Sequence, residues 1–305
     1  MKILVTGGAG FIASNITDAL IEEGHSVFVL DNLSSGFEKN INPEAVFIKA
    51  DIRDKNLSEL FKKEKFDIVN HHAAQMDVRR SVADPAFDAD TNIIGTINLL
   101  QNSIKYGIKK FMFASTGGAI YGEQEYFPAD EKHPTSPLSP YGISKLAVEK
   151  YLFFYSMQYG LKYTILRYAN IYGPRQNPFG EAGVVAIFSS KILNGEQPVI
   201  NGDGKQTRDY TFVSDVVKAN ILTLKDELSD IYNVGTGEET SVNELFNVMN
   251  NMTGEKMVEK HGPAKPGEQL RSVITSEKLK RKFGWAPSTE LAEGLKFTVD
   301  FFKGN

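Results

Sequence analysis

A tyrosine and a lysine four residues apart, Tyr141 and Lys145, are the residues of this chain best suited to move a proton. On a helix, residues at this spacing lie on one face and within reach of each other. A free phenol titrates at about 10, and a neighbouring ammonium lowers its pKa by favouring the phenolate. The pair is therefore a candidate acid–base device, although the same spacing also arises by chance on solvated helices.

The elements that carry this pair follow a repeating pattern. Short apolar runs alternate with amphipathic segments over the first two thirds of the chain, which is typical of βαβ units and a parallel sheet. We expect strands near 3–5, 27–30, 46–48, 68–69, 111–114 and 163–166, and helices near 12–23, 57–64, 91–106 and 141–159. Beyond Asn170 the pattern becomes irregular. The fold class is therefore α/β, a Rossmann-type doubly wound parallel sheet with a smaller mixed α/β C-terminal lobe.

A glycine-rich loop joins the first expected strand to the first helix, in the segment Thr6-Gly7-Gly8-Ala9-Gly10-Phe11-Ile12-Ala13. Glycines let a backbone approach a pyrophosphate, and the following helix offers N–H groups and a positive dipole end. The second strand ends in Asp31, about 20 residues further on, where an acid binds the adenosine ribose. The alternative to a phosphate-binding loop is a simple strand–turn–helix connection without a ligand.

Asp31 also indicates which dinucleotide would bind. A carboxylate repels a 2′-phosphate, and Asn32 and Leu33 follow it where an NADP site needs a cation, so NAD is favoured over NADP. Asp51 and Ile52 follow the third strand. There Asp51 either meets the adenine amino group or caps the next helix.

Hydroxyl groups end the fifth expected strand, in Ser115-Thr116-Gly117-Gly118-Ala119-Ile120-Tyr121-Gly122. Ligands of parallel sheets lie at the carboxyl ends of the strands, so this end and the Tyr141 helix should converge on the cofactor. A hydroxyl there could bind a substrate oxygen and share its proton with Tyr141.

Together these features resemble the extended short-chain dehydrogenase/reductases of the NAD-dependent epimerase/dehydratase family, and most of all the UDP-glucose 4-epimerases, over essentially the whole chain. Further matching segments are His72-Ala73-Ala74-Gln75, Asn92 in Thr91–Thr96, Arg167–Arg175, Gly202–Tyr210 and Lys265-Pro266-Gly267-Glu268. The resemblance implies NAD contacts from Gly7, Gly10, Phe11, Ile12, Asp31, Asn32, Asp51, Ile52, Ala73, Ala74, Gln75, Asn92, Tyr141, Lys145 and Tyr168. It implies substrate contacts from Thr116, Tyr141, Asn170, Arg208, Lys265, Glu268, Arg271 and Ser272.

Three departures from the family pattern matter. Ala13 replaces the third glycine of the phosphate loop, which is tolerated because that position mainly governs helix–strand packing. Lys265 replaces an arginine and loses its bidentate fork, so Arg271 is a candidate to compensate. The family carries its catalytic hydroxyl a fixed number of residues before the position matched by Tyr121. Counting back from Tyr121 without a gap, that residue is Gly117. If this chain has one inserted glycine, it is Thr116. We expect Thr116, with Ser115 as the alternative.

The function that the resemblance implies is reversible C4 epimerisation of a UDP-hexose, UDP-glucose to UDP-galactose, through a 4-keto intermediate. Ser272, seven residues past Lys265, would lie beside the sugar C2 substituent and leave room for an N-acetyl group. No acid directly follows Thr116, which disfavours 4,6-dehydratase and UDP-glucuronate decarboxylase chemistry. A UDP-glucuronate 4-epimerase stays open. A noncatalytic NAD sensor would predict a degraded catalytic pair, and Tyr141 and Lys145 are intact.

Composition sets outer limits on the function. Among 305 residues, 38 acidic and 34 basic residues give a formal charge of −4, which argues against nucleic-acid binding. The chain has no cysteine, so disulfides and thiolate metal sites are excluded. Without an apolar run of about 20 residues or a secretory pattern, we expect no membrane span and a cytoplasmic location. The resemblance implies a homodimer through helices near 91–106 and 141–159.

For several other residues we expect a structural role and no part in the chemistry. We expect no metal site, and we expect His71 and His72 to pack or to make backbone hydrogen bonds. Trp285 should belong to the core. The charge run from Lys278 to Lys282 should form a solvated helix face.

Overall fold

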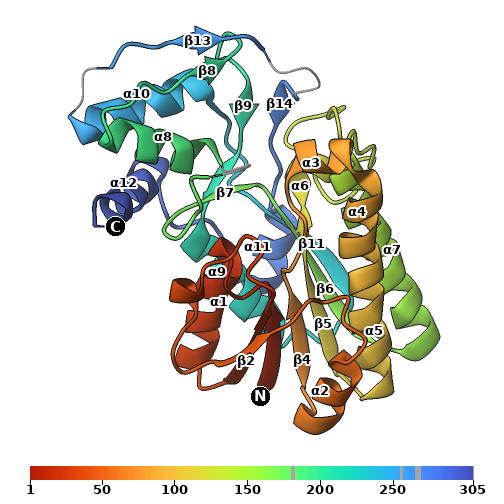
Figure 1. The fold of residues 1–305 in the computed structure, drawn as a ribbon. Coiled ribbons are helices and arrows are strands. Elements are labelled where there is room, and N and C mark those ends of the chain that lie inside the picture. Colours follow the sequence, from red (N-terminus) through yellow and green to blue (C-terminus); the bar gives the residue numbers. More distant parts are fainter. Residues whose placement is uncertain (180–182, 255–256, 265–268, 305) are drawn as a thin grey trace.

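The structure is a computed structural model that describes residues 1–179, 183–254, 257–264 and 269–304. Its centre is a seven-stranded parallel sheet in the order β11-β6-β5-β4-β1-β2-β3 (Figure 1). The strands are β1 (Lys2–Thr6), β2 (Ser26–Asp31), β3 (Val46–Lys49), β4 (Ile68–His71), β5 (Lys110–Thr116), β6 (Lys162–Tyr168) and β11 (Asp230–Val234). The strand order reverses between β1 and β4, and such a switch point opens a ligand crevice at the carboxyl ends of the strands. The expected doubly wound sheet is confirmed.

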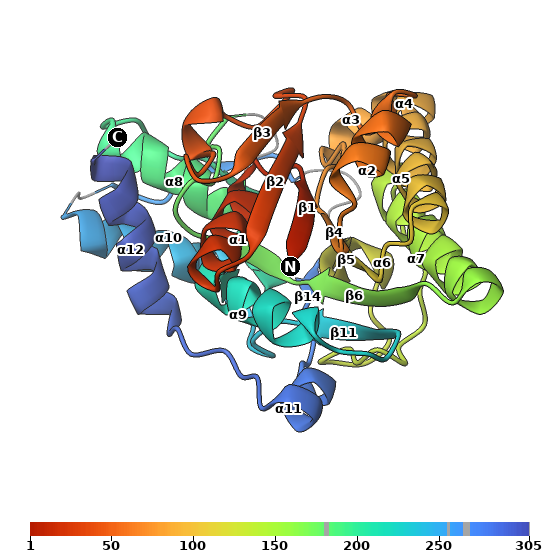
Figure 2. The ribbon, with the colours of Figure 1, turned by 90° about the horizontal axis from the view of Figure 1, so that it is seen from below.

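Helices cover both faces of this sheet (Figures 1 and 2). One face carries α1 (Phe11–Glu22) and α9 (Val213–Leu224), and the other carries α2 (Leu57–Glu64), α5 (Gly95–Lys105) and α7 (Pro140–Tyr159). Side chains alternate along a strand, so Ile3 and Val5 join one core while Leu4 joins the other. None of the helices within the described residues is long and apolar enough to cross a membrane.

A smaller lobe lies over the carboxyl ends of the strands (Figure 1). Its core holds α8 (Val184–Leu193), α10 (Val242–Thr253) and α12 (Leu291–Lys303), with Phe188, Phe246 and Leu295 buried among them. Short pairs of strands connect it: β7 (Asn170–Tyr172) with β10 (Tyr210–Phe212), β8 (Ile200–Asn201) with β13 (His261–Gly262), and β9 (Thr207–Arg208) with both β12 (Thr240–Ser241) and β14 (Arg271–Ser272).

The remaining short helices lie near the crevice or beside the sheet. They are η1 (Glu38–Asn40), α3 (Val78–Ala83), α4 (Pro85–Ala89), the π-helical turn η2 (Asp90–Ile94), α6 (Gly117–Ile120) and α11 (Glu277–Phe283).

The sequence predicts a nucleotide-binding domain of residues 1–170 plus about 205–235 and a lobe of about 171–204 plus 236–305; two sets of contacts bear on this division. The β9 strand pairs only with lobe strands among the described residues, so residues 207–208 lie with the lobe. Leu279 and Trp285 are buried against the β1 and α9 side of the large sheet, so that part of the C-terminal segment lies with the nucleotide domain. Trp285 is a core residue as expected, and its Nε1 donates to the Asp215 carbonyl at 2.9 Å.

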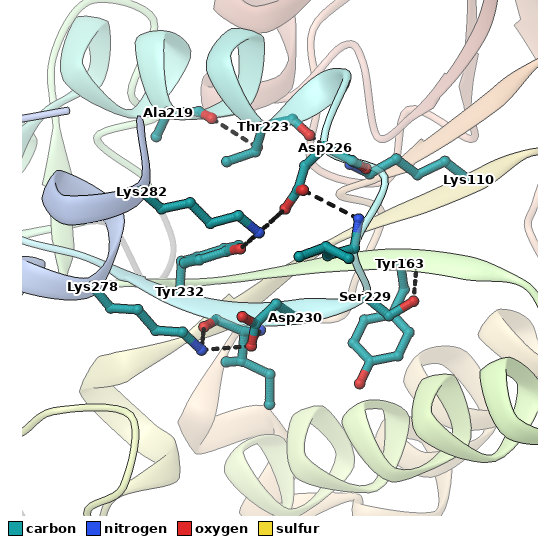
Figure 3. Close-up of polar contacts among 12 residues, drawn as sticks. Lys110, Tyr163, Ala219, Thr223, Asp226, Ser229, Asp230, Tyr232, Lys278 and Lys282 are labelled. Atoms are coloured by element: carbon teal, nitrogen blue, oxygen red, sulfur yellow. Dashed lines mark hydrogen bonds and ion pairs between the residues drawn. The ribbon is translucent and has the colours of Figure 1, made fainter. Parts of the chain in front are cut away.

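The charge run on α11 is largely solvated, as the sequence predicts: Lys280, Arg281 and Lys282 are exposed. Figure 3 shows Lys278 and Lys282 reaching over the edge strand β11. Lys282 Nζ lies 2.7 Å from Asp226 Oδ2, and Lys278 Nζ donates to the Ile231 carbonyl at 2.8 Å. The tips of these two lysines therefore bind residues at the edge of the sheet, while the rest of the run faces water.

Candidate active site

The glycine loop packs closely against the backbone that follows β4. Gly7 has φ +72°, and a Cβ there would lie 2.7 Å from the Ala73 backbone nitrogen. Only glycine fits this left-handed conformation and this contact with the β4 end. Helix α1 begins at Phe11 after Gly10, and no side chain of the described residues caps it, so the N–H groups of Phe11 and Ile12 point into the crevice end of the sheet.

Asp31 ends β2 beside this loop. Its Oδ2 accepts from Ala9 N–H at 3.0 Å and its Oδ1 accepts from Leu33 N–H at 2.7 Å. Burial raises the pKa of this carboxyl, and the two backbone donors oppose that rise. The carboxylate is therefore held rigidly at the end of the strand, with lone pairs left for a further donor.

Asp51 lies against Asn32. Asn32 Nδ2 donates to Asp51 Oδ2 at 2.9 Å. Arg53 binds the same carboxylate in a fork at 2.8 Å and holds its pKa below the usual range. The alternative that Asp51 caps the next helix is wrong, because α2 begins at Leu57 after Asn56. Ile52 is buried next to it.

The Tyr141–Lys145 pair lies at the start of α7. Pro140 is the first residue of that helix, and Ser139 caps it by accepting from Gly142 N–H at 3.2 Å. Lys145 Nζ is 5.8 Å from the Tyr141 ring centroid and donates to the Ala114 carbonyl at 2.8 Å. The two side chains are thus neighbours one helical turn apart.

Lys145 is 4% exposed. Burial lowers the pKa of its ammonium to about 8, while the carboxylates of Asp88 and Glu149 work in the opposite direction. A buried lysine that titrates near physiological pH is typical of catalytic sites.

Thr116 and Ser115 end β5 but point to different surroundings. Ser115 is buried, and its Oγ donates to Glu149 Oε1 at 2.7 Å. Thr116 is half-buried at the edge of the crevice. A Cβ added to Gly118 would lie 3.8 Å from Thr116 Oγ1 and 3.6 Å from Asn170 Oδ1, so these two side chains flank the same glycine. Gly117, the ungapped alternative, packs against Ile274.

A second group of polar residues surrounds the β4 end. Asn92 is 3% exposed, and its amide binds both the N–H and the carbonyl of Gln75 at 2.8 and 2.9 Å. Its Nδ2 also lies 3.2 Å from Ser144 Oγ on α7. The continuous helix expected over 91–106 is interrupted here by the π-turn η2, a feature that often marks functional sites. Ala73 and Ala74 lie just before Gln75.

Tyr168 ends β6 opposite Thr116. Its hydroxyl lies 3.1 Å from His72 Nε2 and 2.8 Å from Asn220 Nδ2, and its ring stacks on His72. Burial lowers the pKa of His72 to about 3, so this imidazole is neutral.

His71 makes side-chain rather than backbone hydrogen bonds. Its ring nitrogens contact Thr6 Oγ1 at 2.7 Å and Thr96 Oγ1 at 2.8 Å. Burial holds its pKa well below the usual value. Both nitrogens are therefore occupied in a structural role.

Three residues expected to contact the substrate lie on short strands. Asn170 begins β7, Arg208 ends β9, and Ser272 ends β14 opposite Arg208. Ser272 is 3% exposed, and Arg208 is half-buried with Nη1 donating to the Thr207 carbonyl at 2.8 Å. Lys265 and Glu268 lie outside the described residues.

Arg271 is engaged by neighbouring side chains. Its guanidinium forms a fork with Glu239 at 3.0 and 2.6 Å and lies over the Phe127 ring at 3.7 Å. The hydrogen bonds from Arg271 hold the pKa of Glu239 below its usual value. The expected compensation for Lys265 would require this pair to open.

Two buried acids were not identified from the sequence. Asp209 is 1% exposed and accepts from Thr236 N–H at 2.9 Å, Gly237 N–H at 3.1 Å and Thr211 Oγ1 at 3.1 Å. Burial raises the pKa of Asp209. It ties the loop after β11 to the strand that carries Arg208. Glu149, 3% exposed, is the second. For Glu149 the detectable signal was an acid within an apolar stretch of the helix.

The whole chain is similar to proteins of a known family. Residues 3–235 match the model of the NAD dependent epimerase/dehydratase family. The chain is 50% identical over 303 residues to a putative UDP-glucose 4-epimerase of Methanocaldococcus jannaschii, covering 99% of each chain.

Two solved structures are similar over nearly their full length. One is the UDP-glucose 4-epimerase of Thermotoga maritima with UDP-glucose, with a TM-score of 0.98, 50% identity and coverage of 100% of this chain and 99% of that one. The other is the Thermus thermophilus UDP-glucose 4-epimerase in complex with NAD, with a TM-score of 0.95, 44% identity and coverage of 100% and 99%.

Proposed function

Because this chain belongs to the NAD-dependent epimerase/dehydratase family, we propose that it is an isomerase that interconverts UDP-glucose and UDP-galactose by inverting C4. The observation that carries the proposal is the buried Lys145 beside Tyr141 at the mouth of a dinucleotide crevice. Full-length similarity to UDP-glucose 4-epimerases supports the choice of sugar nucleotide.

The crevice fits NAD on structural grounds. Gly7 adopts a left-handed conformation and packs on the chain that follows β4, and a glycine-rich loop between β1 and α1 is the place where a pyrophosphate binds in such folds. The N-terminus of α1 offers N–H groups, and the Asp31 carboxylate suits a ribose diol and repels a 2′-phosphate. Asn32, Asp51 and Ile52 would lie on the adenine side; the nicotinamide side would be formed by Ala73, Ala74, Gln75, Asn92 and Tyr168.

The chemistry that a bound NAD would supply is reversible hydride transfer at C4 of the sugar, with a 4-keto sugar between the two transfers. The Tyr141 phenolate takes the C4 hydroxyl proton and later gives it back, directly or through Thr116. The Lys145 ammonium stabilises the phenolate by its charge and reaches the nicotinamide ribose. Arg208 and Asn170 hold the UDP-sugar from the lobe side while the keto sugar turns, with Lys265, Glu268 and Arg271 as further candidates.

The test of the function is direct. Purified protein incubated with UDP-glucose should give UDP-galactose, detected by NMR, and should contain or require NAD. The same assay with UDP-glucuronate as the substrate tests the alternative of a UDP-glucuronate 4-epimerase. A 4-keto-6-deoxy sugar as the product would indicate a dehydratase. Protein that neither holds nor needs NAD would refute the proposal, and NAD-loaded protein without any product would favour a sensor.

Thr116 is the proposed hydroxyl partner of Tyr141. Thr116→Ala should lower kcat about 100-fold, because a positioned proton-transfer group is lost. Ser115→Ala should cost about tenfold or less, since it removes one buried hydrogen bond to Glu149 and no substrate contact. Initial rates of both variants decide the assignment, and a larger loss for Ser115→Ala would reverse it.

Ser272 is proposed to set substrate breadth. A small side chain opposite Arg208 leaves room for an N-acetyl group at C2. Ser272→Tyr should reduce kcat/KM for UDP-N-acetylglucosamine more than about tenfold relative to UDP-glucose, by steric exclusion. Parallel assays of the two substrates check it. Rejection of the N-acetyl sugar by the unmodified protein would count against this pocket.

A homodimer and a cytoplasmic location stay predictions. Helix α7 supports the dimer, because Phe153, Phe154 and Met157 are 56%, 49% and 74% exposed on it. An apolar patch of this kind is typical of an interface. Phe154→Glu should convert a dimer to a monomer in light scattering, whereas Phe179→Glu, 74% exposed outside α7, should not.

A further inference from the structure

Glu149 continues the line of catalytic groups along α7. Tyr141, Lys145 and Glu149 follow one another at intervals of four residues, so they lie along one face of the helix. Glu149 lies one turn deeper than Lys145 and is 3% exposed. Its distance from the crevice end of the helix leaves it out of contact with the reacting sugar in the mechanism above.

The partners of Glu149 are the two strands that end in the active site. Glu149 Oε1 accepts from Ser115 Oγ at 2.7 Å and from Arg167 Nε at 3.0 Å, and Oε2 accepts from Arg167 Nη2 at 2.6 Å. Ser115 and Arg167 are register partners in β5 and β6. Each directly precedes a candidate site residue, Thr116 in β5 and Tyr168 in β6.

The network extends to a third strand. Arg167 Nη1 donates to Tyr121 Oη at 3.0 Å, and Tyr121 Oη donates to Asn233 Oδ1 at 2.7 Å in β11. One carboxylate thus joins α7 to the ends of β5 and β6 and, through Arg167, to β11.

A buried ion pair of this kind is a costly way to stabilise a fold. Arg167 and Glu149 side chains are 4% and 2% exposed, so both charges have lost their water. Well-packed apolar residues in the same places are often equally or more stable. Bidentate geometry does, however, fix orientation more tightly than apolar packing.

We propose that Glu149 is a positioning residue of the epimerase reaction: through Ser115 and Arg167 it holds α7 against β5 and β6, and so holds Tyr141 and Lys145 against Thr116. The inference rests on the proposed function. Near-attack geometry is demanding, and a displacement of about 1 Å is enough to lower a rate about 100-fold.

The first variant is Glu149→Gln. The amide keeps an acceptor for Ser115 but presents a donor to Arg167, so the fork breaks. We expect kcat for UDP-glucose to fall about 100-fold at every pH, with KM and NAD retention within about threefold because the lobe and the glycine loop are untouched. The alkaline limb of the pH profile should also move to lower pH, since Glu149 opposes the lowered pKa of Lys145. A shifted limb with an unchanged maximum would overturn positioning in favour of charge alone.

A second variant distinguishes the loss of positioning from the effect of leaving the buried Arg167 charge without a partner. The double replacement Glu149→Leu with Arg167→Met removes both charges at similar volume, so it should fold with a Tm near that of the parent. We expect its kcat to stay about as low as that of Glu149→Gln. Recovery of kcat to within about threefold of the parent would overturn the proposal, because the loss would then come from the unpaired arginine.

The matched control is the ion pair between Asp226 and Lys282, shown in Figure 3. Asp226 has a side chain 6% exposed and lies near Lys110 at the amino end of β5, the end remote from Thr116. Asp226→Asn should leave kcat unchanged even if it lowers Tm.

A readout independent of turnover completes the test. Amide hydrogen exchange at residues 115–117 and 167–169 should accelerate about tenfold or more in Glu149→Gln and stay unchanged in Asp226→Asn. Unchanged hydrogen exchange in Glu149→Gln would overturn the positioning role of Glu149, whatever the activity of the variant. A parent protein that does not convert UDP-glucose contradicts the proposed function and leaves the exchange result to decide that role.

Discussion

Replacing Tyr141 by phenylalanine is expected to lower kcat for UDP-glucose about 10³-fold, because the variant lacks the phenol oxygen proposed to take the C4 hydroxyl proton, directly or through Thr116. The ring and the start of α7 should be retained. The Ser139 cap and the bond from Tyr141 N–H to Ser81 Oγ use other atoms. Steady-state assays with product analysis measure the effect.

Binding and folding should be nearly unchanged in this variant. NAD content, Tm and the affinity for UDP should stay close to those of the parent, because the phenol oxygen is one contact among the many expected for NAD and the sugar nucleotide. Tyr151→Phe, on the same helix and 38% exposed, is the control and should keep full turnover. Residual activity of Tyr141→Phe within about tenfold of the parent would exclude Tyr141 as the proton-transfer group.

Replacing Lys145 by methionine is expected to lower kcat about 100-fold or more and to change its pH dependence. Burial lowers the pKa of Lys145 to about 8, so the ammonium is charged below that pH and neutral above it. Its support for the phenolate is therefore present at neutral pH and is lost as the pH rises through about 8. The parent should lose kcat/KM on that alkaline limb, and Lys145→Met should lack the limb.

The free energy of unfolding should rise with pH over the range in which kcat/KM falls. An unfolded lysine titrates at about 10.4, so between about 8 and 10.4 the unfolded chain binds more protons than the folded one at this site. The free energy of unfolding therefore rises with pH across this window. Lys145→Met should flatten that slope and should be no less stable at pH 7, because a buried charge has been removed. Chemical denaturation at a series of pH values measures both.

Lys110 provides a matched control. It is 5% exposed, burial lowers its pKa to about 8, and it lies at the opposite end of the same strand β5 that ends in Thr116. Its Nζ donates to the Asp226 carbonyl at 2.7 Å rather than to any crevice residue. Lys110→Met should change the pH dependence of stability in the same way and leave turnover per folded molecule intact. Equal losses of kcat in both variants would contradict a specific role for Lys145.

Local patterns account for the parts of this molecule that were predicted correctly. A strand buried on both faces must be apolar, and a covering helix must be amphipathic, so β1, β2, β5 and β6 were recognisable from composition alone. Gly7 was recognisable because the loop needs a left-handed residue, and Tyr141 with Lys145 because a helix places such a spacing on one face. All of these signals act within about five residues of one another.

The details that the sequence did not reveal involve residues far apart in the chain. Lys278 and Lys282 bind Asp230 and Asp226, and Arg271 is held by Glu239, each more than thirty residues away. Asn32 donates to Asp51 from the end of another strand. At the π-turn, the Asn92 amide pairs with Gln75.

Residue chemistry and short-range order therefore sufficed for the nucleotide fold and the proton-transfer pair, since helix periodicity and glycine conformation are local. The distribution of charge around that pair required the folded chain. Ser115, Glu149 and Arg167 come from three separate elements, and whether an acid is a solvated residue or a buried clamp depends on which strand ends surround it. Desolvation and long-range pairing, which set the pKa of Lys145 and the orientation of Thr116, exist only after the sheet and α7 have packed together.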